Sequence, residues 1–419
     1  MLGRRLQTTT KKEPATCAIV AIGSFATVVA QIDERISLLF TLLWTSLALY
    51  LCARGRERVR FTGMSFVTVF MAIALGFYCS VCCLAFGEIG YLSGFFQLYL
   101  KCLLMYLIGI LARDAISPGR GWSLIFVSYI AASCIYVGWA MINYFPGFTA
   151  WLSSMTYLFE AKNSLGQIAG VAAIILIVYA LERPKLAGRW LLYLATAAVL
   201  MICILFIQCR TAFLAVCCSA FFLLILKKRT KTIIGALALL LLALLLSPDF
   251  SNLFSHAFFI DKYIGTDANT MSSGRLDLWA DALLSLGGHE LFGLGAYYVD
   301  NMYINLLVNI GIVGLVLVMG LWIPRVVINL TNGINSSLVP NDRRLLMRIA
   351  LCLTIFYIVE STLEAHPPFG PGTCSFMFWM LCGYLDGWPS VMGKSHCAAE
   401  DSGSSKAMKK YLGGGPYGD

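Results

Sequence analysis

The sequence predicts an all-α polytopic membrane protein with about twelve transmembrane helices and one large external loop. Of its 419 residues, 59% are hydrophobic and only 13% are charged, whereas an ordinary soluble domain has about 25% charged residues. Most of the apolar stretches reach the roughly 18 residues that mark a membrane span. This composition excludes a disordered chain, a nucleic-acid-binding domain and an ordinary soluble enzyme.

Twelve apolar segments divide the chain. They lie near residues 17–32, 36–53, 64–86, 91–112, 121–143, 163–182, 188–208, 211–226, 231–247, 302–325, 345–365 and 372–389. Nine spans therefore fall within residues 1–247 and three within residues 302–389. Residues 248–301 between them form the external loop, and the polar, Gly-rich residues 390–419 are predicted to be a disordered cytoplasmic tail.

Basic residues decide the orientation, because lysine and arginine concentrate in the cytoplasmic loops of membrane proteins. Most of the 31 lysines and arginines lie at one end of the predicted spans, in clusters such as 54–60 and 227–231 and at Arg325, where the tenth span is expected to end. The opposite end has only Arg35, Lys162, Arg210, Lys262 and Arg275. Both termini are therefore predicted to be cytoplasmic, and the net charge of +9 reflects topology rather than a nucleic-acid partner.

The external loop is the longest connection, and long loops often carry function. Within its residues 269–288, Leu276, Trp279, Ala280, Leu283 and Leu284 have the spacing of an amphipathic helix, which would lie on the membrane or on the bundle. Ser272 or Ser273 can cap this helix, which places Arg275 at its N-terminus. Because the helix dipole disfavours a cation there, a bound anion would account for Arg275; an exposed loop arginine is the alternative.

Arg210 and Lys101 are cations that lie in or beside a predicted span. Arg210 occupies the tight turn between the seventh and eighth spans, either as a snorkelling anchor of a helix end or as a functional group. Its outer position runs against the positive-inside bias and favours function. Lys101 lies near the centre of the fourth span, one turn from Gln97, so it must face a wet cavity or a partner.

Acidic and amide side chains gather at the outer ends of other spans. Asp300-Asn301 precedes the tenth span, as an N-cap or as a group that orients or deprotonates a hydroxyl. The remaining members are Glu160, Lys162 and Asn163 before the sixth span, and Glu360, Glu364 and His366 at the outer end of the eleventh. Glu360 and Glu364 share a helix face, where acid/base groups, a proton path, a cation site and plain interfacial acids are all open interpretations.

Metal-binding motifs and cysteine pairs give little support for a metal site. The sequence has no DxD, no HExxH and no Cys/His cluster. Its one CxxC, Cys79 to Cys82, lies inside a span, where cysteines act as small hydrophobic residues. The aromatic residues of the outer segment 144–160 form either an interfacial belt or a surface on which sugar rings stack.

Several short motifs resemble those of the O-antigen ligases and the O-antigen/capsule polysaccharide polymerases, over roughly residues 155–325. Asn163-Ser-Leu-Gly166 and Arg210-Thr-Ala-Phe-Leu each open a predicted span. A third run comprises Gly274-Arg275-Leu-Asp-Leu-Trp279, Gly288-His-Glu-Leu-Phe-Gly293-Leu-Gly295, Asp300-Asn301-Met-Tyr303 and Gly311-Ile-Val-Gly314. The resemblance rests on this order of motifs in one external loop that leads into a span.

The resemblance implies a glycosyltransferase fold of the GT-C type in the bacterial inner membrane, with the active site facing the periplasm. It implies metal-independent glycan transfer from undecaprenyl diphosphate, without a cofactor, in lipopolysaccharide or capsule biosynthesis and beside a chain-length regulator. Family arginines that bind the diphosphate match Arg210 and Arg275. Ligases usually carry a histidine just before the asparagine of the third motif; this chain has Asp300 there, which favours a polymerase.

We therefore expect a polymerase that moves a growing glycan from its lipid diphosphate onto the non-reducing-end sugar of a lipid-linked repeat unit, with inversion at the anomeric carbon. Arginines would stabilise the leaving diphosphate, and an acid would activate the acceptor hydroxyl. The first candidate for this acid is Asp300, followed by Glu160 and Glu360. The expected catalytic residues are Arg210, Arg275 and Asp300, and the expected substrate-binding residues are Glu160, Lys162, Asn163, Asn301, Tyr303, Glu360, Glu364 and His366. The alternatives are a ligase that transfers the glycan to lipid A core and, without enzyme activity, a flippase or transporter of lipid-linked oligosaccharides.

Overall fold

The computed structural model describes most of the chain, and it is helical. The described residues are 14–32, 37–54, 62–144, 162–183, 188–258, 269, 274–370 and 372–386. Within these ranges every regular element is a helix and no strand occurs. The predicted all-α class is therefore confirmed, whereas the predicted tail 390–419 lies outside the described residues.

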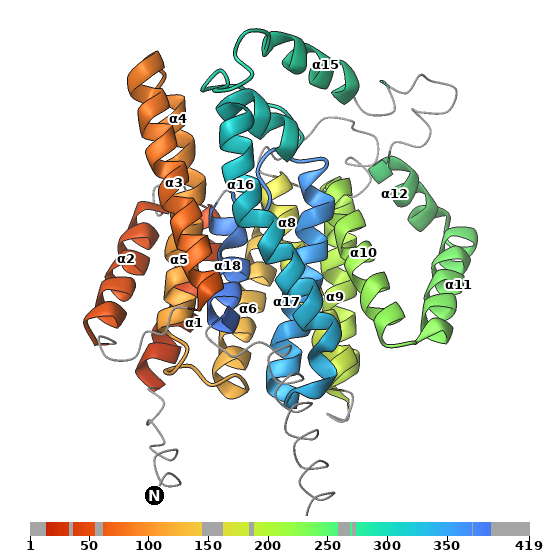
Figure 1. Ribbon diagram of the computed structural model, residues 1–419. Coiled ribbons are helices and arrows are strands. Elements are labelled where there is room, and N and C mark those ends of the chain that lie inside the picture. The colour runs from red at the N-terminus through yellow and green to blue at the C-terminus, as the bar shows by residue number, and fades with distance from the viewer. Residues whose placement is uncertain are drawn as a thin grey trace, which may run out of the picture.

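A helix lies at each of the positions where an apolar segment predicts one (Figure 1). In chain order these are α1 (Pro14–Val29), α2 (Ser37–Arg54), α3 (Gly63–Phe86), the continuous run of α4 (Gly90–Gly94), η3 (Phe95–Leu100) and α5 (Lys101–Leu111), α6 (Arg120–Tyr144), α8 (Lys162–Glu182), α9 (Arg189–Phe206), α10 (Arg210–Leu226), α11 (Thr230–Leu246), α16 (Met302–Ile334), α17 (Asn341–Ser361) and α18 (Gly372–Asp386). The external loop adds α12 (Pro248–Phe258) and α15 (Arg275–Ser285).

Seven helical segments among the described residues are long and apolar enough to cross a membrane. They are Pro14–Ile32, Gly63–Phe86, Gly90–Leu111, Arg120–Tyr144, Lys162–Glu182, Arg189–Phe206 and Met302–Leu338. The chain is therefore an all-α protein with the helices of a membrane-embedded bundle, and the full number of twelve spans stays a prediction.

Helix α8 runs through the interior of the bundle. Its residues from Leu165 to Leu176 are all buried, and it packs against α6, α9, α10 and α17. A helix that is apolar on every side is typical of a protein interior or of a membrane span, and its burial places α8 in the interior. The polar residues that begin α8, Lys162 and Asn163, are thereby held at one end of the bundle, close to the end of α17.

Helix α16 is longer than the predicted span 302–325, because it continues through Pro324 to Ile334. The prediction ended the span at Arg325, on the assumption that this charge belongs to a cytoplasmic loop. That assumption is wrong: Arg325 is only 1% exposed and lies inside the bundle. The helix tolerates the charge because the bundle supplies a partner for it.

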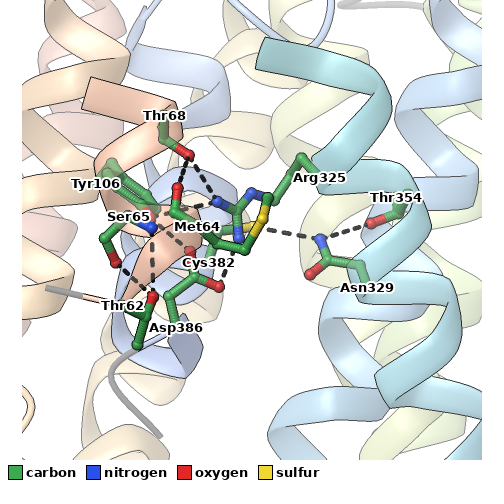
Figure 2. A network of polar contacts seen from close by, with 10 residues as sticks. All are labelled: Thr62, Met64, Ser65, Thr68, Tyr106, Arg325, Asn329, Thr354, Cys382 and Asp386. Carbon is green, nitrogen blue, oxygen red and sulfur yellow. Dashed lines mark hydrogen bonds and ion pairs between the residues drawn. The ribbon is translucent and has the colours of Figure 1, made fainter. Parts of the chain in front are cut away.

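Arg325 belongs to a buried polar network that joins α3, α5, α16 and α18 (Figure 2). Its guanidinium donates to Asp386 Oδ1 at 2.7 Å and to Thr68 Oγ1 at 3.1 Å. The Tyr106 hydroxyl donates to the other oxygen of Asp386. Because a buried charge without its partner is costly, this network fixes the four helices relative to one another.

The external loop places α12 and α15 at the end of the bundle opposite the N-terminus, which we call the outer end (Figure 1). Gly274 occupies the N-cap position of α15, and Asn269 Oδ1 accepts from the N–H of Asp277 in its first turn at 3.2 Å. The predicted caps, Ser272 and Ser273, lie outside the described residues. Helix α15 buries Ala282 and part of Trp279, while Leu276, Leu283 and Leu284 of the predicted apolar face are exposed rather than packed on the bundle.

Candidate functional site

The glycine-rich end of the external loop is bonded to a break in α16. Gly311 has φ 66° and ψ −174°, which interrupts the helix, and a side chain there would strike the carbonyl of Leu291. The N–H groups of Leu294 and Gly295 donate to the carbonyls of Val308 and Asn309 at 2.7 and 2.9 Å. The backbone groups freed by the break are therefore satisfied by the loop rather than by the helix.

The second half of α16 is bonded to the same loop. The N–H of Ile312 donates to the carbonyl of Glu290 at 2.8 Å. From the other side, the Tyr78 hydroxyl donates to the carbonyl of Ile310 at 2.7 Å, and the Tyr91 hydroxyl to that of Gly293 at 2.8 Å. Two motifs quoted from the sequence, residues 288–295 and 311–314, thus form one joint that fixes the loop over the bundle.

Asp300 and Asn301 follow this joint and take separate roles. The Asn301 Oδ1 accepts from the N–H groups of Tyr303 and Ile304 at 3.0 and 3.1 Å, so Asn301 is the N-cap of α16. Its Nδ2 donates to the carbonyl of Thr362 at 3.0 Å, which ties α16 to the end of α17. Because Asn301 makes the cap, the carboxylate of Asp300 is left to face other groups.

Arg275 lies between two carboxylates. Its Nε is 3.5 Å from Asp300 Oδ2, and its Nη2 is 3.8 Å from Glu364 Oε1. Charge-assisted hydrogen bonds of arginine are usually about 2.7–2.9 Å long, so both ion pairs are loose. The first residue of α15 thereby joins the start of α16 to the segment after α17, and its guanidinium retains bonding capacity for a further anion.

Glu364 is also held by α8 and α10. Asn163 Nδ2 donates to Glu364 Oε2 at 2.8 Å, and the Thr211 hydroxyl donates to Oε1 at 3.2 Å. Gly166 allows this approach, because a side chain there would strike the sulfur of Cys209. The motifs 163–166 and 210–214 are therefore adjacent in space, and both face the carboxylate of Glu364.

Lys162 and Arg210 complete the group of charges. The positive charge of Lys162 interacts electrostatically with those of Arg210 and Arg275, and with the carboxylate of Glu364. We call Lys162, Arg210, Arg275, Asp300 and Glu364 the outer cluster. Among the described residues of this cluster three cations face two carboxylates, and the cations could bind an anionic ligand.

The two carboxylates of the outer cluster differ in how deeply they are buried. Burial raises the pKa of Glu364 to about 7, with Arg275 opposing this shift and Asp300 adding to it. Its side chain is 7% exposed, against 25% for Asp300. Burial also lowers the pKa of His366, against the opposing charge of Asp300, which leaves the imidazole mainly neutral at pH 7. Glu364 is therefore poised to exchange a proton near neutral pH.

The remaining predicted residues lie in different places. Glu360 is fully buried one helical turn beneath Glu364 and interacts with it electrostatically. Gln167 lies beside it, and both carboxylate oxygens of Glu360 are buried. Tyr303 packs against the hydrophobic core of the bundle instead of the outer cluster. Glu160 lies outside the described residues.

Four residues of the site had not been predicted from the sequence. Thr211 binds Glu364, and the Tyr298 ring lies 6.3 Å from the ring of His366. Asn305 and Asn309, one turn apart on α16, bind the backbone of the external loop through Val299 and Tyr297. The spacing of two asparagines by four residues in an apolar helix was the available signal.

The described residues contain no group of three or more His, Cys, Asp or Glu side chains arranged to hold a metal ion. No protein-family model matches the chain, and no curated protein matches it.

Proposed function

We propose that this protein is a membrane-embedded glycosyltransferase, of the GT-C type, that polymerises a polysaccharide. It would transfer a growing glycan from undecaprenyl diphosphate to the non-reducing-end sugar of a lipid-linked repeat unit at the outer face of the bacterial inner membrane. The observation that carries the proposal is Arg275 between Asp300 and Glu364, with Lys162 and Arg210 beside them. This arrangement offers a site for a diphosphate next to a group that can accept a proton.

The three cations suit the diphosphate of the donor. Arg275 and Arg210 each begin a helix, so their side chains lie beside backbone N–H groups that favour anions. As the bond between the anomeric carbon and the diphosphate oxygen breaks, negative charge grows on the leaving diphosphate. Fixed arginines stabilise that charge more than they stabilise the starting state.

Glu364 suits the role of general base. The acceptor hydroxyl oxygen would attack the anomeric carbon, its proton would pass to Glu364, and the electron pair of the broken bond would leave with the diphosphate. A base with a pKa of about 7 is ionised enough to accept the proton and basic enough to hold it. Direct displacement inverts the anomeric carbon. Asp300, the base expected from the sequence, would instead orient Arg275 and interact with His366.

The test is polymerisation by the purified protein in lipid nanodiscs, supplied only with a synthetic undecaprenyl-diphosphate-linked repeat unit. We expect a ladder of products, unaffected by a chelator. Arg275→Ala and Arg210→Ala should each lower the rate by about 100-fold, and Arg275→Lys should restore part of it. Arg344→Ala, at the opposite end of the bundle, is the matched control and should leave the rate unchanged.

Each rival gives a different result. Transfer that occurs only when lipid A core is added identifies a ligase. Movement of the labelled lipid across the bilayer without new glycosidic bonds identifies a flippase. A ladder that is unaffected by both arginine variants would show that the outer cluster is not the active site.

A further inference from the structure

A cavity of about 290 Å³ opens beside the outer cluster. It lies between α4 and η3 on one side and residues 295–310 on the other, and His366 forms part of its wall. Its volume is near the lower end of the roughly 300–1,000 Å³ that ligand pockets usually enclose. The joint between the external loop and α16 shapes it, since Tyr91, which lines the cavity, is bonded to Phe292 and Gly293.

The lining of this cavity differs in charge from the outer cluster. No Asp, Glu, Lys or Arg is among the described residues that line it. Its wall includes Tyr91 and Tyr99, which are buried, and Phe95 and Tyr297, which are half-buried, together with the amide of Gln97 and the hydroxyl of Ser93. These described residues offer an anion no counter-charge, whereas a sugar ring needs an aromatic surface and neutral hydrogen-bonding groups.

Gln97 is the side chain best placed to bind such a ring. Its Nε2 donates to the Ser93 hydroxyl at 3.1 Å, which leaves the amide oxygen and the second N–H available to a ligand. Asn305 and Asn309, in contrast, are occupied with the backbone of the external loop and act as framework. Gln97 also lies within η3, a π-helical segment, and such segments occur often at functional sites.

His366 joins the cavity to the outer cluster. Its side chain lines the cavity and interacts electrostatically with Asp300, while Asp300 pairs with Arg275. A ring in the cavity would therefore lie against His366, and the diphosphate of a second molecule would lie on the cations. A neutral sugar in the cavity and an anionic diphosphate on the outer cluster would then bind at adjacent sites.

We propose that this cavity is the acceptor subsite, which binds an uncharged sugar ring of the incoming repeat unit through Gln97 and the surrounding tyrosines. The assignment to the acceptor rests on the proposed glycosyltransferase function. The binding of a neutral sugar in the cavity is independent of that function, and it can be measured without turnover.

The first experiment measures binding by saturation-transfer NMR on the protein in lipid nanodiscs, because sugar detergents would compete. The probes are the methyl glycosides of glucose, galactose and N-acetylglucosamine, with methyl glucuronide as the charged counterpart. We expect at least one neutral glycoside to bind and the glucuronide not to bind. Gln97→Leu should weaken binding about five- to tenfold, and Ala296→Trp, which fills the cavity, should abolish it.

Phe96→Leu is the matched control, because Phe96 belongs to the same segment but does not line the cavity. It should bind as the wild type does, and thermal unfolding confirms that each variant is folded. Equal binding by all variants, binding of none of the neutral glycosides, or equal binding of the glucuronide overturns the proposal. Displacement of the glycoside by undecaprenyl phosphate assigns the cavity to the lipid and also overturns it.

A second experiment separates this proposal from the proposed function. If the wild type polymerises the repeat unit, Gln97→Leu should raise the KM for the acceptor by the factor measured in binding and leave kcat nearly unchanged. An unchanged KM overturns the subsite while polymerisation stands. Glycoside binding by a wild type that makes no polymer overturns the proposed function, and the neutral-sugar site stands.

Discussion

Replacing Glu364 with glutamine should change how the stability of the protein depends on pH. Burial raises the pKa of this carboxyl from its ordinary 4.5 to about 7. The folded state therefore holds the proton more tightly than the unfolded state does. The stabilisation that follows is fully present below about pH 4.5 and is lost as the pH rises through about 7.

The magnitude follows from the two pKa values. The difference between 4.5 and about 7 corresponds to about 3 kcal/mol, at about 1.4 kcal/mol per unit. The side chain is only 7% exposed, so solvent screening reduces this little. Glutamine does not titrate. The free energy of unfolding of the wild type, relative to Glu364→Gln, should therefore fall by about 3 kcal/mol between pH 4.5 and 8.

The assay is thermal unfolding of both proteins in one detergent, at half-unit steps of pH. Glu290→Gln is the control: Glu290 is exposed, and hydrogen bonds from its own N–H and that of Gly288 lower its pKa. Its removal should therefore change the pH dependence in the opposite direction. A wild-type-minus-variant difference that is flat, or that grows toward high pH, would refute the buried, proton-binding Glu364 described above.

Three other predictions address the site and the bundle. With limiting acceptor, kcat/KM should rise with pH to a plateau above about 7 as Glu364 loses its proton. Because the charge of Asp300 raises the pKa of Glu364, Asp300→Asn should move the midpoint of this rise to lower pH. A pH–rate profile of both proteins measures the two effects. Asn301→Ala removes the cap of α16 and the bond to Thr362, so it should lower the free energy of unfolding by about 2 kcal/mol. Asn301→Asp should retain the cap, and the Tm of the two variants in detergent distinguishes them. Asp386→Ala leaves Arg325 buried without its partner and should cost about 3–5 kcal/mol, and adding Arg325→Met should recover part of that loss.

The positions of the helices could be predicted because each span is a local feature of the sequence. Apolar runs of sufficient length form helices wherever they lie, and the structure has helices at those positions. The end of α16 could not be predicted in the same way. The sequence around Arg325 predicts a charge in a loop, because its partner, Asp386, lies 61 residues further along the chain.

In the candidate site too, local features could be predicted from the sequence and contacts between distant residues could not. Arg275, Asp300 and Glu364 could be named from their places at the outer ends of predicted helices, and the structure brings them together. The raised pKa of Glu364 could not be predicted, because it depends on how deeply the packed helices bury this carboxyl. Thr211 was overlooked because its importance comes from a contact with Glu364 across two helices, and a sequence alone does not show that pairing.

The break at Gly311 has a mechanical consequence. The last carbonyls before it, from Val308 to Ile310, are bonded to the external loop and Tyr78 rather than to the next helical turn. The loop is bonded to the longer piece as well, through Ile312, and Asn301 ties the short outer piece to the carbonyl of Thr362. A load on the loop would therefore be shared by both pieces of α16 and by the end of α17, so Asp300 would keep its place beside Arg275.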